Sequence, residues 1–277
     1  MSKYFNDTRK AQEWAAQEGA ADLNAEQLLK TIREANAASA EVAGARLNHC
    51  RKLRLYQPPG MPIILSQRDA ALQAAAESYR ALRTRLLRLQ SKEGVRSVVI
   101  TSALGGEGKT LTAMNLALAL CQLPEMRVLL IDGDLRTRRL TSLFGCPPPG
   151  LAEVLAGKTS FEETFLATDL PNLYIMGAGT PSASPPELYA GPRWKESIGW
   201  ASECFKLILI DSTPILPLSD FELISAACYG YLTVVRALTT QREALQKAAR
   251  VGDPKKSLGV VLNSIETGAY ANYYGPY

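Results

Sequence analysis

A glycine-rich turn between a short apolar run and a helix-forming segment constrains this chain more than any other feature. Residues 98–100 are apolar and predict a buried strand, and residues 111–120 predict a helix. Between them, residues 102–110 read SALGGEGKT. A chance glycine turn would not require a strand before it and a helix after it. The three parts together form the pattern of a phosphate-binding loop, so the sequence predicts a nucleotide-binding protein.

The loop supplies the groups that bind a nucleotide. Glycines adopt backbone torsions that other residues avoid, so successive N–H groups can converge on one phosphate beside the positive end of the helix dipole. Lys109 can reach the β- and γ-phosphates of ATP, and the Thr110 hydroxyl can bind Mg²⁺. Ala103 stands where the usual pattern begins with glycine. The candidate nucleotide-binding residues are Gly105, Gly106, Glu107, Gly108, Lys109, Thr110 and Leu111.

Composition and charge argue against several other classes of protein. With 277 residues and a net charge of +4, the chain has room for one large domain with appendages. Its arginines cluster without interleaved aromatic residues, so no nucleic-acid surface is expected. No signal peptide and no apolar run of membrane-spanning length is found, and the five scattered cysteines form no metal-ligand pattern. We therefore expect a cytoplasmic protein without a membrane span of its own.

The first 60 residues differ from the rest because they are rich in Ala, Gln and Glu. They predict an N-terminal helical extension, with one helix over residues 25–35, and the prolines and glycine at 58–62 predict a linker. A second helix is expected from Ser66, since its apolar positions recur every three or four residues. These positions are Leu72, Ala75, Tyr79, Leu82, Leu86 and Leu89.

Predicted strands and helices alternate after the loop. The strands are 127–132, 206–211, 231–236 and 258–263, and the helices lie near 112–122, 193–203, 218–228 and 240–250. This alternation predicts an α/β fold with a mainly parallel sheet of the P-loop NTPase type and helices on both faces. Ligands of such sheets bind at the carboxyl ends of the strands.

Two of the predicted strands end in aspartate. One ends at Asp132, which is followed by Asp134 and Arg136, and the other ends at Asp211 in the sequence DSTP. Both strand ends are expected at the same edge of the sheet as the phosphate loop. Acids placed there can hold Mg²⁺ with its waters and accept the proton of a nucleophile. A single aspartate could be a strand-end cap, but the set favours phosphoryl transfer.

These motifs resemble those of the bacterial tyrosine kinases of capsule and exopolysaccharide synthesis, in their split cytoplasmic form. The resemblance covers residues 61–277 and includes the phosphate loop, D-x-D-x-R at 132–136, D-x-x-P at 211–214 and the stretches 150–155, 185–188 and 259–263. An E-x-x-R-x-x-R motif is matched by Glu77, Arg80 and Arg83. The terminal tyrosine cluster of the family is matched by Tyr270, Tyr273, Tyr274 and Tyr277.

The resemblance implies a kinase domain over residues 61–265 and a flexible tyrosine-rich tail over 266–277. It implies that Asp132 faces the substrate hydroxyl and that Thr110, Asp134 and Asp211 hold Mg²⁺, with Lys109 completing the catalytic set. It also implies a ring of subunits joined through the E-x-x-R-x-x-R helix, in which each tail is phosphorylated by a neighbour. A separate transmembrane polysaccharide co-polymerase would activate the kinase and hold it at the inner face of the membrane.

Four other interpretations remain at this point, two for the whole protein and two for single features. A switch ATPase of the septum-positioning and partitioning type has the same fold, but its loop carries an extra lysine where this chain has Leu104. A nucleotide-binding scaffold of a polysaccharide assembly complex would not need the lysine and the three acids. The tyrosine-rich end could be a passive disordered tail, and Glu77 with Arg80 could be an ordinary ion pair on a solvated helix.

Overall fold

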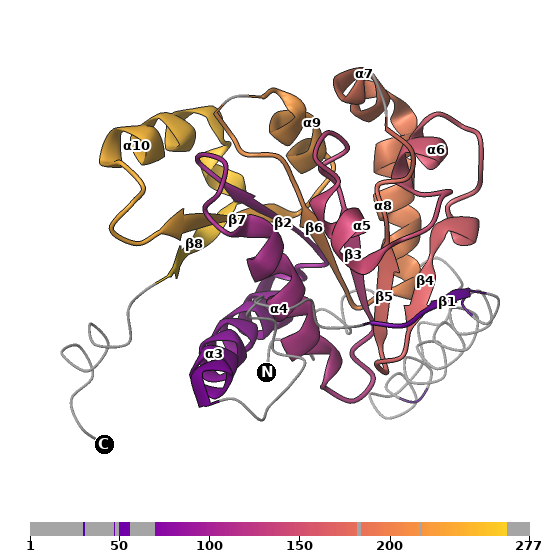
Figure 1. Cartoon of the computed structure of the whole chain (residues 1–277), viewed down its shortest axis with the longest axis horizontal. Coiled ribbons are helices and arrows are strands. Elements are labelled where there is room, and N and C mark those ends of the chain that lie inside the picture. Colours follow the sequence, from indigo (N-terminus) through magenta and orange to yellow (C-terminus); the bar gives the residue numbers. More distant parts are fainter. Residues whose placement is uncertain are drawn as a thin grey trace, which may run out of the picture.

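An eight-stranded sheet organises the part of the chain that the computed structural model describes (Figure 1). That part comprises Lys30, Leu47 and residues 50–55, 70–181, 184–216 and 218–264. The strand order is β1-β4-β5-β3-β6-β2-β7-β8, and every neighbouring pair is parallel except β4 and β5. The strands are β1 (Arg51–Leu53), β2 (Ser97–Ser102), β3 (Val128–Asp132), β4 (Leu166–Thr168), β5 (Leu173–Met176), β6 (Leu207–Asp211), β7 (Gly230–Arg236) and β8 (Ser257–Asn263).

Helices cover both faces of the sheet because alternate strand residues point to opposite sides. Val98 of β2 packs in one core cluster with α3 (Ala70–Glu93) and α4 (Lys109–Cys121), whereas Val99 packs in the other. The second cluster contains residues of α6 (Leu151–Leu155), α7 (Pro185–Ala190), α8 (Pro192–Cys204), α9 (Asp220–Ala226) and α10 (Arg242–Val251). In Figure 1, α3 and α4 lie together on one side of the sheet and α6 to α9 on the other.

The elements predicted from periodicity are present, which confirms the mainly parallel sheet with helices on both faces. Strands β2, β3, β6, β7 and β8 and helices α3, α4, α8, α9 and α10 lie within a few residues of the expected ranges. Helix α4 begins at Lys109 rather than Leu111, so the loop lysine and threonine are its first residues. The apolar stripe of α3 packs on the body through Ala75, Tyr79, Leu82, Leu86 and Leu89.

Three strands and three short helices were not predicted. Strands β1 and β4 have three residues each, β5 has four, and α5 (Arg139–Phe144), α6 and α7 have five or six. Segments of this length show too little periodicity to be recognised. Strand β4 pairs antiparallel with β5, and two single 3₁₀ turns, η1 (Glu162–Thr164) and η2 (Pro254–Lys256), complete the described elements.

Residues 51–53, which the sequence assigned to the N-terminal extension, form a strand of the sheet. Strand β1 pairs parallel with β4 at one edge, and the Arg51 guanidinium donates to the carbonyl oxygens of Pro148 and Pro149 at 2.9 and 3.1 Å. Leu47 and Leu55 on either side are buried. Apart from Lys30, which is helical, the helix expected over 25–35 lies outside the described residues, as do the linker at 58–62 and the tail tyrosines.

Candidate active site

The phosphate loop joins β2 to α4 and lies beside the carboxyl ends of β6 and β3. Its residue Gly108 is the N-cap of α4 and has a φ of 94°, which favours glycine. A Cβ atom on Gly108 would lie 2.1 Å from the Nδ2 atom of Asn263, at the end of β8. The position therefore disfavours any side chain for two reasons, the backbone torsion and the close approach of the Asn263 side chain.

Contacts from the β7–β8 side fix the loop between Leu104 and Gly108. The Glu107 side chain is buried, and its carboxylate accepts hydrogen bonds from the Leu104 N–H at 3.0 Å and from the Thr240 hydroxyl. The Glu107 carbonyl accepts a hydrogen bond from Asn263 Nδ2 at 2.9 Å. The loop is thus shaped before a nucleotide arrives, because its one acidic side chain is turned inward.

Lys109 brings the loop and the two strand-end motifs together. Its ammonium donates to Asp134 Oδ2 at 3.2 Å and lies 3.9 Å from Asp211 Oδ1, and its side chain is 10% exposed. The register of β3 and β6 pairs Asp132 with Asp211, so the acids of the two motifs are neighbours. The structure therefore brings Lys109, Asp132, Asp134 and Asp211 to one edge of the sheet, as the sequence predicted.

Asp211 is buried without a hydrogen bond to either carboxylate oxygen from the described part of the chain. Burial raises its pKa to about 7, while the Lys109 ammonium and the Thr110 hydroxyl act in the opposite direction. Unpartnered buried oxygens beside a threonine hydroxyl fit a hydrated Mg²⁺ bound to nucleotide phosphates. Within the described ranges, no three His, Cys, Asp or Glu side chains form a metal site by themselves.

Asp132 is held firmly by its surroundings. Its Oδ2 atom accepts hydrogen bonds from the N–H and the hydroxyl of Thr141, at 2.7 and 2.6 Å, and its Oδ1 atom accepts one from the Asp134 N–H at 3.3 Å. Burial raises the pKa of Asp132 to about 6, and the bonds from Thr141 oppose that rise. A carboxyl group with a pKa near neutrality can exchange a proton at physiological pH.

Asp134 has the opposite electrostatic character. Burial favours its neutral form, but the Lys109 ammonium and the Thr137 N–H, which donates to Oδ1 at 3.0 Å, prevail and lower its pKa. Two residues later, Arg136 forms a bidentate pair with Asp220 of α9, at 2.8 and 3.1 Å. Asp134 is therefore ionised at neutral pH and faces the loop lysine.

Hydrogen bonds to the backbone of Gly133 hold the turn between Asp132, at the end of β3, and Asp134. The Gly133 N–H donates to the Asp211 carbonyl at 2.7 Å, and the Gly133 carbonyl accepts a hydrogen bond from the buried Tyr189 hydroxyl, also at 2.7 Å. A Cβ atom on Gly133 would lie 2.9 Å from the Asp211 carbonyl oxygen. Glycine at this position lets the β3 and β6 motifs pack against each other.

The predicted interface residues lie on α3, away from the acids. Arg80 pairs with Glu77 on the same helix, and both are partly or fully exposed. The Arg83 guanidinium donates to the carbonyl of Ala119, near the end of α4, at 2.6 Å. Glu77 and Arg80 are thus available on the surface, while Arg83 has a partner within the chain.

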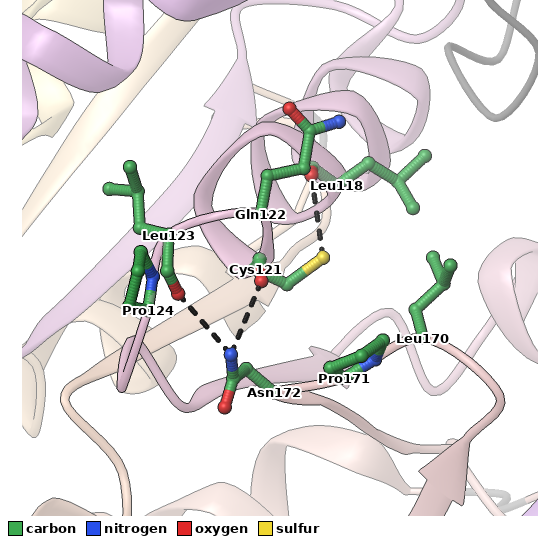
Figure 2. Close-up of a pocket in the computed structure, with 8 residues that line it drawn as sticks. All are labelled: Leu118, Cys121, Gln122, Leu123, Pro124, Leu170, Pro171 and Asn172. Atoms are coloured by element: carbon green, nitrogen blue, oxygen red, sulfur yellow. Dashed lines mark hydrogen bonds between the residues drawn. The ribbon is translucent and has the colours of Figure 1, made fainter.

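A pocket of about 260 Å³ lies at the far end of α4 from the phosphate loop. Figure 2 shows Asn172 beneath it, donating to the carbonyl oxygens of Cys121 and Leu123 at 3.4 and 3.2 Å. Its other lining residues are Leu118, Gln122, Pro124, Leu170 and Pro171. The pocket belongs to the amino-terminal end of the sheet and has no part in the candidate site.

Comparison with known proteins identifies the family. Residues 98–274 match the family described as the CobQ/CobB/MinD/ParA nucleotide binding domain. The tyrosine-protein kinase YwqD of Bacillus subtilis is 32% identical over 201 residues, which are 72% of this chain and 84% of YwqD. The chain belongs to the bacterial tyrosine kinases. The phosphate loop and the three aspartates lie within the residues that match the nucleotide-binding family.

Further relatives differ in length. The putative tyrosine-protein kinase EpsB of Ralstonia nicotianae is 32% identical over 204 residues, but the match covers only 27% of EpsB against 72% of this chain. The kinase domain of Escherichia coli tyrosine kinase ETK has a TM-score of 0.66 at 27% identity, over 77% of this chain and 84% of that one. Among the described residues, no helix combines the length and apolarity required to cross a bilayer.

Four residues that shape the site were not chosen from the sequence as site residues. Thr141 and Tyr189 hold the β3 motif, and Thr240 and Asn263 hold the phosphate loop. Asn263 ends a stretch whose resemblance to the family had been noticed. Tyr189 and Thr240 act through hydroxyl groups from distant segments, and Thr141 acts through its hydroxyl and N–H nine residues after Asp132, so spacing within the chain gives no signal for them.

Proposed function

We propose that this chain is an ATP-dependent protein tyrosine autokinase that phosphorylates the C-terminal tyrosine cluster of a neighbouring subunit. The observation that carries the proposal is the convergence of Lys109 with Asp132, Asp134 and Asp211 at one edge of the sheet. Phosphoryl transfer depends on neutralising charge at the γ-phosphate and on accepting the proton of the attacking hydroxyl. A lysine and three acids of different proton affinity supply both functions.

Binding of ATP involves residues 105–111 of the loop and α4. The backbone N–H groups of the loop and the first turn of α4 bind the β- and γ-phosphates. In the structure the Lys109 ammonium contacts Asp134 and lies near Asp211. Since the γ-phosphate competes for the same ammonium, nucleotide binding exchanges these carboxylate contacts for phosphate contacts.

Thr110, Asp134 and Asp211 are the residues that would hold Mg²⁺, by the threonine hydroxyl and, through water, by the carboxylates. The ion, when bound, neutralises charge on the β- and γ-phosphates. Asp134 is suited to this role because its carboxylate is ionised, and Asp211 because its buried oxygens accept no hydrogen bond from the described chain. The Lys109 ammonium then stabilises the remaining negative charge that develops on the phosphates.

Asp132 is the general base. The tyrosine oxygen forms a bond to the γ-phosphorus, the bond from that phosphorus to the bridging oxygen of ADP breaks, and the phenolic proton passes to Asp132. Its carboxyl group has a pKa of about 6, so it is largely unprotonated at pH 7 and can accept the proton. The proton is afterwards released to solvent.

We propose the cellular role by analogy with the bacterial tyrosine kinases. The kinase acts in exopolysaccharide or capsule synthesis and export, assembles into a homo-oligomeric ring through α3, and lies in the cytoplasm at the inner face of the membrane through a separate transmembrane co-polymerase that activates it. The acceptors are Tyr270, Tyr273, Tyr274 and Tyr277. Each phosphate adds a charge of about −1.5 to −2, which the acids of the site repel, so a phosphorylated tail leaves the neighbouring site.

The Asp132→Asn variant tests the assignment of the base. It is expected to keep Mg-ATP binding, measured by calorimetry, and to lose tail phosphorylation, measured by mass spectrometry, because asparagine keeps the shape but cannot accept the proton. Loss of Mg-ATP binding with the chemistry intact would show that the acids have other roles. Glu162→Gln, which removes an exposed acid, is the matched control.

A switch ATPase is the second candidate, because the matching family includes MinD and ParA. Such a protein would hydrolyse ATP and change its association state without forming phosphotyrosine. Leu104 stands where the extra lysine of those loops is expected, and it is 40% exposed. Release of inorganic phosphate without phosphotyrosine would favour this candidate, and tail phosphorylation favours the kinase. A nucleotide-binding scaffold of a polysaccharide assembly complex would do neither.

A further inference from the structure

Thr141, in the first turn of α5, connects Asp132 to the carboxyl end of β5. Its hydroxyl lies 2.6 Å from Asp132 Oδ2 and 2.7 Å from the N–H of Ala178. Its own N–H lies 2.7 Å from the same Oδ2 atom. The side chain of Thr141 is almost completely buried, so water does not compete for these bonds.

The direction of each bond follows from the donors available. The Ala178 N–H can only donate, so the Thr141 oxygen is its acceptor. The single hydroxyl proton of Thr141 is therefore directed at Asp132 Oδ2. That oxygen receives two short bonds, whereas Oδ1 receives one longer bond, 3.3 Å, from the Asp134 N–H. The two oxygens of Asp132 are thus unequal.

We propose that Thr141 is a positioning residue for phosphoryl transfer, which fixes the Asp132 carboxylate so that Oδ1 accepts the proton of the substrate hydroxyl. The inference rests on the proposed function of Asp132 as the base. The hydroxyl of Thr141 is not consumed: it anchors Oδ2, while the oxygen–phosphorus bond forms, the bond to ADP breaks and the proton moves to Oδ1. Orientation of a catalytic group by hydrogen bonds is a source of rate enhancement.

A purely structural role for Thr141 predicts different behaviour. In that case the residue serves to fill space beside Asp132 and to join α5 to β5, and its replacement lowers stability without a selective effect on turnover. Valine matches threonine in shape but lacks the hydroxyl, and serine keeps the hydroxyl but lacks the methyl group. The pair of variants therefore separates the hydrogen bond from the packing.

The experiment compares Thr141→Val, Thr141→Ala and Thr141→Ser in the full chain by autophosphorylation kinetics with Mg-ATP. Removal of the hydroxyl is expected to lower kcat about tenfold and leave KM for Mg-ATP within about twofold, since a hydrogen bond to a charged group is lost at the base and not at the nucleotide. The serine variant is expected to keep kcat within about twofold of the unchanged protein. Thr164→Val is the matched control, because Thr164 is another buried threonine whose hydroxyl donates to a backbone carbonyl, that of Phe161 at 2.7 Å.

Two results would overturn the inference. One is a kcat for both Thr141→Val and Thr141→Ala that equals that of Thr164→Val, and the other is equal loss of kcat in the serine and valine variants. Circular dichroism melting identifies a variant that fails to fold, and the smaller alanine and serine variants then carry the comparison. Normal turnover of Asp132→Asn would instead refute the proposed base, so the two failures are distinguishable.

Discussion

Individual carboxylates of the site differ in how the protein surrounds them. Asp132 accepts three hydrogen bonds, Asp134 accepts one from the Lys109 ammonium, and Asp211 is buried with the same ammonium 3.9 Å away and no hydrogen bond from the described chain. A buried carboxylate without hydrogen bonds destabilises the folded state in its charged form. The charge on Asp211 therefore lowers the stability of the folded chain, and a bound hydrated cation would offset this loss.

Replacing Asp211 with asparagine is expected to stabilise the nucleotide-free, metal-free protein by about 1–3 kcal/mol at pH 8. The pKa of Asp211 is raised from 3.8 to about 7 in the folded state. Between these values the unfolded chain releases a proton that the folded chain retains, so the wild type loses stability as pH rises through this window. Asparagine does not titrate, and its advantage should vanish near pH 4. Urea unfolding in EDTA at pH 8 and pH 4 measures the difference in unfolding free energy between the variant and the wild type. An equal difference at both pH values would contradict the account.

The element that depends most on one residue is the loop that precedes α4. Gly108→Ala is expected to weaken ATP binding at least tenfold, because alanine at a φ of 94° is strained and its Cβ would overlap Asn263. Asn263→Ala in the same chain removes the overlap but leaves the strain, so it should restore binding only in part. Gly199→Ala in α8 is the control, since nothing lies within 4 Å of that position. Calorimetry with ATP that finds unchanged affinity for Gly108→Ala would refute this reading of the loop.

At the level of elements, the periodicity of apolar residues predicted most of the helices and strands. The long helix α3 shows its period over 24 residues, and the strand β6 is a continuous apolar run that ends in aspartate. The order of such elements implies the positions of Lys109 and Asp211. Strands β1, β4 and β5 give too short a signal, and β4 is further obscured because it runs antiparallel to β5. Contacts such as Thr141 with Asp132 depend on how α5 packs against β3, so the sequence alone did not reveal them.

At the scale of the whole molecule, the ring proposal concerns the exposed side of α3. Arg80→Ala is expected to give monomers with little change in unfolding free energy, because the ion pair of Arg80 with the exposed Glu77 on the same helix contributes little to stability. Arg83→Ala should also destabilise the monomer, by about 1–2 kcal/mol, since it removes the hydrogen bond to the Ala119 carbonyl. Light scattering and urea unfolding separate the two effects, and an unchanged mass for Arg80→Ala would remove this interface.

The central claim, tyrosine phosphorylation between subunits, is tested most directly by mixing two variants with Mg-ATP. One is Lys109→Met with its tail intact, and the other carries phenylalanine at Tyr270, Tyr273, Tyr274 and Tyr277 but keeps Lys109. Neither chain can phosphorylate itself, since one lacks the lysine that contacts phosphate, a loss of about 10²–10³ in rate, and the other lacks acceptors. Mass spectrometry of the tail is expected to find phosphate on the tyrosines of the Lys109→Met chain only in the mixture. Phosphotyrosine in the unchanged protein but not in the mixture, or in neither with ATP still consumed, would contradict the account.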